Sequence, residues 1–173
     1  MDKKKYVVVF AYDKKYPERV LLVLKDRPTW MVGCLNLLGG KVEKDEHELD
    51  AALRELKEES GLELKSSKKQ QIKLMGAIIT DASIIYCISI PVDSKFPIVP
   101  RSGETEKSAW YDWSEIKIDK RLMPNLRCLI PLMRCGVSGW FANGDPLSDD
   151  VYDMRLRFLL DHPVPHHPEN QNV

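Results

Sequence analysis

The chain has 173 residues, 43% of them hydrophobic, a length and composition that predict a globular domain with a buried core. Lysine plus arginine and aspartate plus glutamate number 26 each, so the overall charge does not favour nucleic-acid backbones or acidic membranes. No apolar run approaches the roughly 20 residues that span a bilayer, and the four cysteines lack paired metal-binding spacing. We therefore expect a cytoplasmic protein with reduced thiols, in which any site for a small polyanion is built locally.

The first part of the chain predicts strands followed by a helix. Residues 6–12 and 19–25 are rich in β-branched and aliphatic residues and are expected to form a hairpin. Residues 35–38 predict a third short strand that ends at a pair of glycines. Asp45 is expected to open a helix with acidic residues in its first turn.

The remainder of the chain predicts further strands and a second helix. Strands are expected at 72–80, 84–92 and 108–113. Apolar residues return at helical spacing over 122–133, where two prolines predict a kink. Residues 151–160 are expected to form a last short helix and 162–173 a loose tail, which leaves one domain over 1–161. This order of elements favours a mixed β-sheet covered by helices.

The predicted helix after Asp45 carries an unusual charge pattern. At about 100° per residue, one apolar stripe is formed by Leu49, Ala52, Leu53 and Leu56, and three carboxylates share the adjoining side: Glu55, Glu58 and Glu59. Like charges at this spacing repel, and a hard divalent cation such as Mg²⁺ would turn the repulsion into attraction. The alternative interpretation is a solvated acidic face, which is the usual meaning of such a run.

The spacing of the whole segment from Gly40 to Leu62 resembles the box of the Nudix hydrolases, G-x5-E-x7-R-E-U-x-E-E-x-G-U, with U aliphatic. Every specified position matches: Gly40, Glu46, Arg54, Glu55, Leu56, Glu58, Glu59, Gly61 and Leu62. The resemblance implies an α/β/α sandwich with a mixed sheet and a metal-dependent hydrolase that cleaves a pyrophosphate linkage in a nucleotide.

The same resemblance assigns roles to particular residues. Mg²⁺ or Mn²⁺ would be held by Glu55, Glu58, Glu59 and the carbonyl of Gly39, and two of these glutamates, Glu58 and Glu59, would also serve catalysis. Arg54 and Glu46 would orient the ligands. A relative that binds without cutting is the alternative, but such relatives usually lose box glutamates, and this chain keeps them all.

A further carboxylate is often supplied by a loop after the box, as metal ligand or general base. The candidates are Glu104 and Glu106, which come just before the strand expected at 108–113. A solvated loop is the alternative for each of them.

Weaker features resemble the oxidised-purine nucleoside triphosphatases. The run from Asn36 through Gly39 to Lys41 is similar to that branch, where the asparagine contacts the base, so Asn36 and Lys41 are candidate substrate-binding residues. Asn125 follows a proline where that branch has two aspartates, and it can donate and accept hydrogen bonds. The next residue, Leu126, can do neither, which leaves the oxidised base open. Trp30 is a candidate for stacking on a base, with packing as its alternative.

We therefore expect a hydrolase that converts nucleoside triphosphates, such as 8-oxo-dGTP, to monophosphate and pyrophosphate. The first alternative is a nucleoside diphosphate linked to another group, such as ADP-ribose or a dinucleoside polyphosphate. The second is processing of an RNA cap or 5′ end, although neutral charge and the lack of a basic, aromatic-rich stripe disfavour extended RNA contact. The sequence does not decide between a monomer and a homodimer.

Overall fold

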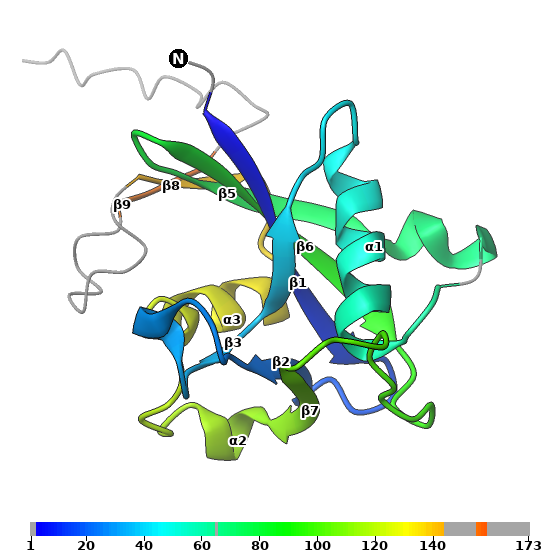
Figure 1. The fold of residues 1–173 in the computed structure, drawn as a ribbon. Coiled ribbons are helices and arrows are strands. Elements are labelled where there is room, and N and C mark those ends of the chain that lie inside the picture. Colours follow the sequence, from blue (N-terminus) through cyan, green and yellow to red (C-terminus); the bar gives the residue numbers. More distant parts are fainter. Residues whose placement is uncertain (1–2, 65, 144–154, 159–173) are drawn as a thin grey trace, which may run out of the picture.

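A mixed β-sheet lies between helices in the computed structural model of the protein, which describes residues 3–64, 66–143 and 155–158 (Figure 1). The strands are β1 (Lys4–Asp13), β2 (Arg19–Leu24), β3 (Leu35–Asn36), β4 (Leu38–Lys41), β5 (Lys73–Ile79), β6 (Ser83–Val92), β7 (Lys107–Asp112), β8 (Trp140–Asn143) and β9 (Arg155–Phe158). The α-helices are α1 (Glu48–Ser60), α2 (Trp113–Ile116) and α3 (Leu126–Arg134), and short 3₁₀ helices cover Thr29–Met31 and Ser66–Gln71.

Strand β1 is the centre of the sheet. It pairs in parallel with β6 along its whole length and antiparallel with β4 through residues 6–9. Strand β2 pairs antiparallel with both β7 and β3. Strand β5 lies between β6, with which it pairs antiparallel, and β8, with which it pairs in parallel. The expected mixed sheet is therefore confirmed.

Alternation along β1 explains why helices cover both faces of the sheet. Successive side chains of a strand point to opposite faces. Val7 and Val9 belong to the core cluster that includes Ala52 and Leu56 of α1, whereas Phe10 belongs to the cluster that contains the apolar residues of α3. Figure 1 shows α1 and α3 on opposite sides of the strands. This arrangement confirms the α/β/α sandwich.

Helix α1 begins and ends where its capping residues allow. The Nδ1 atom of His47 accepts a hydrogen bond from the backbone N–H of Leu49 at 3.2 Å and satisfies one free donor of the first turn. Gly61 ends the helix with φ of 74°, and a Cβ atom at this position would overlap the carbonyl oxygen of Val99, so no side chain fits there. The second glycine of the box motif is therefore required by both conformation and space.

The expected hairpin is confirmed, because β1 and β2 pair antiparallel with Tyr12 opposite Val20. Two other expectations about the elements need correction. Asp45 does not open α1, because it has φ of 63° in a turn closed by a hydrogen bond from the Glu46 N–H to the Glu43 carbonyl. The helix expected at 151–160 is wrong at Arg155–Phe158, which forms β9 against β8.

The remaining expectations concern the tail, the cysteines and membrane-spanning helices. The tail expected at 162–173 lies outside them, so the boundary of the single domain stays a prediction. The cysteines, Cys34, Cys87, Cys128 and Cys135, are free thiols. Among the described residues, no helix is long and apolar enough to cross a bilayer.

Candidate active site

Helix α1 carries the predicted carboxylates on the side that meets β4. Glu55 and Glu59 are one helical turn apart and buried, and Glu58 between them is partly exposed. Burial raises the pKa of the Glu55 carboxyl above its ordinary value, against the opposing effect of a hydrogen bond from Arg54. The structure thus brings the three box glutamates to one region, as their spacing predicts.

Arg54 ties these carboxylates together. Its Nε donates to Glu46 at 2.9 Å, and its Nη1 donates to Glu55 at 2.6 Å and to Glu58 at 3.4 Å. The bond from Arg54 is the main reason why the pKa of Glu46 lies below its usual value. A planar guanidinium with several fixed donors suits this shared role. The geometry agrees with the orienting role that the box implies for Arg54 and Glu46.

Glu59 faces the glycine turn at β4 and the end of β2. The backbone N–H of Gly39 donates to its Oε2 at 2.9 Å, and the Nζ of Lys25 lies 3.9 Å from its Oε1. Desolvation nevertheless raises the pKa of this carboxyl to about 8, because its side chain is only 7% exposed.

The loop before β7 separates the two further candidates. Glu106 is 2% exposed at its side chain, and Lys25, which also contacts Glu59, donates a hydrogen bond to it. Glu104 pairs instead with the exposed Arg27 at 3.2 Å and accepts the backbone N–H groups of Thr105 and Glu106. Through Lys25, therefore, Glu106 is linked to the carboxylates of α1.

A cavity of about 1330 Å³ extends from the glycine turn across the sheet. It is lined at the carboxylate end by Lys25, Gly39 and Gly40, and elsewhere by residues that include Trp30, Met31, Asn36, Met123, Asn125, Leu126 and Leu129. Three of the four predicted substrate-binding residues thus line one cavity. The fourth, Lys41, is exposed, and its backbone carbonyl accepts a hydrogen bond from Arg54.

The two asparagines offer complementary groups to this cavity. The Oδ1 of Asn36 already accepts the N–H of Leu37 at 2.9 Å, which leaves the Nδ2 amide as its donor. The Oδ1 of Asn125 is buried and has no hydrogen-bond partner among the residues that the structure describes. A buried acceptor without a partner is costly, and a ligand that donates to it would remove this cost.

The donor chemistry of the carboxylate cluster fits a hard divalent cation. Its groups are oxygens, and burial raises the pKa of the Glu55 and Glu59 carboxyls although Arg54 and Lys25 lie nearby. Within residues 3–64, 66–143 and 155–158, no three Asp, Glu, His or Cys side chains are grouped closely enough to form a metal centre as they stand. Basic side chains form ion pairs with these carboxylates. Arg54 pairs with Glu55 and Glu58, and Lys25 pairs with Glu59 and Glu106.

Lys25 was not among the predicted site residues. Its position could have indicated it, because it directly follows the buried run of β2 and lysine is seldom buried without a specific partner.

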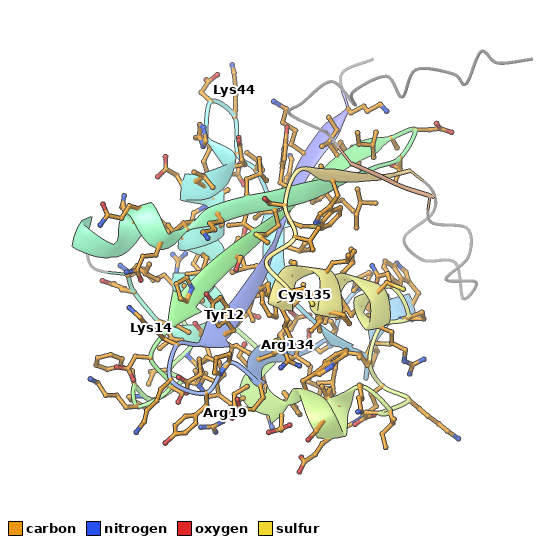
Figure 2. The ribbon with its side chains drawn as sticks, turned by 180° about the vertical axis from the view of Figure 1, so that it is seen from behind. Tyr12, Lys14, Arg19, Lys44, Arg134 and Cys135 are labelled. Atoms are coloured by element: carbon orange, nitrogen blue, oxygen red, sulfur yellow. The ribbon has the colours of Figure 1, made fainter. Side chains whose placement is uncertain are left out.

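A second cavity of about 440 Å³ is lined by residues that include Tyr12, Arg134 and Cys135, which Figure 2 shows together at the end of α3. None of the predicted site residues lines this second cavity.

Comparisons with known proteins give the fold and family. A Nudix-family hydrolase from Clostridium perfringens is 24% identical with a TM-score of 0.58, over 80% of this chain and 100% of that one. The MutT protein of Bacillus halodurans is 18% identical with a TM-score of 0.65, over 88% and 97%. No curated protein matches the chain. The NUDIX domain model matches residues 2–133, and the chain therefore belongs to the Nudix hydrolase family.

Proposed function

We propose that this hydrolase cleaves the pyrophosphate linkage of a nucleotide, converting a nucleoside triphosphate to its monophosphate and pyrophosphate. Mg²⁺ or Mn²⁺ would be held by Glu55, Glu58, Glu59 and the carbonyl of Gly39. A divalent cation there supplies neutralisation of charge on the phosphate oxygens.

One observation carries this proposal. The same cavity reaches the glycine turn beside Glu59 and the two asparagines near α3, so a single ligand can contact both ends. A nucleotide has this division, with anionic phosphates at one end and a base with hydrogen-bonding edges at the other. Neutral net charge in the chain as a whole is compatible with such a local site.

The base end offers polar contacts between apolar walls. Asn36 can donate through Nδ2 and Asn125 can accept through Oδ1, while Leu126 and Leu129 provide apolar surface. Trp30 is 56% exposed at the cavity, where its ring is free to stack on a base. A pocket of mostly apolar lining with a few polar groups is typical of small-molecule sites.

At the phosphate end, hydrolysis requires a water oxygen to bond to phosphorus as the bridging P–O bond breaks. The water loses its proton to a base, for which the carboxylates of Glu58, Glu59, Glu104 and Glu106 are the candidates. Of the two loop residues we favour Glu106, because it shares Lys25 with Glu59. Arg54 keeps its partners oriented during this step.

Incubation with a nucleotide panel tests the proposal. The panel contains dGTP, 8-oxo-dGTP, dATP, dCTP, ADP-ribose and a dinucleoside polyphosphate, each with Mg²⁺ and with products separated by chromatography. We expect a triphosphate to be the best substrate and to give equal amounts of monophosphate and pyrophosphate. Preference for ADP-ribose or the dinucleotide would replace this substrate class, and absence of turnover on the whole panel would contradict the proposal.

A further inference from the structure

Lys25 is a basic residue near the carboxylates whose backbone N–H and carbonyl both form hydrogen bonds. Its backbone N–H donates to the Cys34 carbonyl at 2.9 Å, and its carbonyl accepts the N–H of Gly33 at 2.8 Å. Its side chain is only 14% exposed, an unusual position for a lysine without a specific partner. The main chain of Lys25 is thus fixed, and its ammonium group is mostly buried.

The ammonium group of Lys25 has two carboxylate partners from different elements. It donates to Glu106, just before β7, and lies 3.9 Å from Glu59 of α1. It also lines the cavity, which none of the glutamates in the cluster does. By contrast, Arg54 binds carboxylates but does not line the cavity, and Arg27 has a side chain that is 65% exposed. Lys25 thus joins the carboxylate cluster to the cavity.

A divalent cation at the cluster would compete with this ammonium group for the same oxygens. Bound to Glu59, it would bring two positive charges close to Lys25 and would take over the neutralisation of that carboxylate. Lysine is a compact point charge on a flexible stem of four methylene groups, so its head can move while its backbone stays fixed. The cavity that Lys25 lines is the space in which phosphate oxygens would be met.

We propose that Lys25 is a phosphate-binding residue controlled by the metal. It pairs with Glu59 and Glu106 in the metal-free protein and turns to the phosphate groups of the ligand when a divalent cation neutralises those carboxylates. This inference rests on the proposed function, since it assumes that the cluster binds a cation and the cavity binds phosphate. It predicts that the effect of Lys25 on phosphate binding depends on the metal.

Calorimetric titration with inorganic pyrophosphate tests this dependence in EDTA and in Mg²⁺. Lys25→Met keeps the apolar stem and removes the charge. In Mg²⁺ it should weaken binding about ten- to a hundredfold, the loss expected of one hydrogen bond to a charged group. In EDTA the change should stay within about twofold, because Lys25 is then occupied by its carboxylates. Lys25→Arg keeps a cation and should recover most of the loss.

Lys107→Met is the matched control, because Lys107 follows Glu106 directly but is exposed at the start of β7. It should bind pyrophosphate as the wild type does in both conditions. If Lys25→Met fails to fold, Glu106→Gln provides the second test. It removes one partner of Lys25 and should strengthen pyrophosphate binding in EDTA by several-fold.

Two results would overturn the inference. Equal losses for Lys25→Met in EDTA and Mg²⁺ would mean that Lys25 meets phosphate without control by the metal. No loss in either condition would leave it a structural counter-ion. Both differ from a failure of the proposed function, which would show as wild-type protein that neither turns over the nucleotide panel nor gains pyrophosphate affinity from Mg²⁺.

Discussion

The carboxylate of Glu55 occupies the space that a side chain at Gly40 would need. A Cβ atom placed on Gly40 would overlap both carboxylate oxygens of Glu55. The backbone of Gly40 is outside the left-handed region, so space rather than conformation requires glycine here. The first glycine of the box is thus explained by the first glutamate of the cluster.

Gly40→Ala should separate activity from stability. The clashing atoms are the flexible end of a side chain, so Glu55 can move at little cost to folding, but it then leaves its place in the site. We expect kcat to fall by about 10², the scale of loss from a displacement of about 1 Å, with little change in the melting temperature.

Gly61→Ala is the contrasting control for Gly40→Ala. Gly61 has φ of 74° and meets the backbone carbonyl of Val99, which cannot rotate away. This variant should lose about 1–3 kcal/mol of folding free energy. Kinetic assays and thermal unfolding of both variants check the contrast, and an unchanged kcat in Gly40→Ala would show that the position of Glu55 does not matter.

Replacement of a cluster glutamate by glutamine should remove activity but not the fold. We expect Glu58→Gln and Glu59→Gln each to lower kcat by at least about 10², because a ligand or base is lost. Stability should be kept or slightly raised, since one of several repelling charges disappears and glutamine can still accept the N–H of Gly39 at position 59. Near-normal turnover in both variants would contradict the assignment.

The sequence predicted this cluster better than it predicted the surroundings. Glu55, Glu58 and Glu59 lie on one helix, so their relation depends only on the period of 3.6 residues. Lys25 meets Glu59 and Glu106 only after β2, α1 and β7 have packed together, and no local pattern encodes such a contact. Non-local pairing is what a single sequence conveys least.

The same distinction applies to the fold. Strand β1 was recognisable because a run rich in β-branched and aliphatic residues over 6–12 is a local signal. The segment Arg155–Phe158 lies within the helix expected at 151–160, but its basic and apolar residues alternate, and it pairs with β8 as a strand. Tertiary pairing can override local propensity in so short a segment.

Removal of divalent cations should abolish turnover reversibly. Exhaustive treatment with EDTA is expected to give inactive protein, and Mg²⁺ or Mn²⁺ should restore it, because the cluster offers oxygen ligands that suit hard cations. Circular dichroism in EDTA provides the control for folding, since Lys25 and Arg54 still neutralise the carboxylates without metal. Full activity after chelation would refute metal dependence.

The two loop glutamates should differ strongly. Glu106→Gln is expected to lower kcat by about 10² or more, because its buried carboxylate shares Lys25 with Glu59. Glu104→Gln should have a small effect, since its partner Arg27 is mostly exposed and such pairs contribute little. Kinetic assays of both variants measure this difference, and equal, small losses would show that neither loop carboxylate takes part in catalysis.

The two asparagines should control which base is preferred. Asn36→Ala and Asn125→Ala are each expected to reduce discrimination between purines by about 1 to 3 kcal/mol, while turnover of a poor substrate changes much less. Metal-ligand variants would instead depress all substrates together, since every nucleotide in the panel presents the same linkage.

Aspartate at the same two positions tests which atom contacts the base. Asn36→Asp keeps the oxygen that binds Leu37 but loses the Nδ2 donor, so it should lose selectivity as Asn36→Ala does. Asn125→Asp keeps the oxygen that lacks a partner and should retain more selectivity than Asn125→Ala. The measurement is kcat/KM for dGTP, 8-oxo-dGTP, dATP, dCTP and ADP-ribose with each variant. If a triphosphate is preferred but no substitution alters selectivity, the reaction class stands and the base binds elsewhere in the cavity.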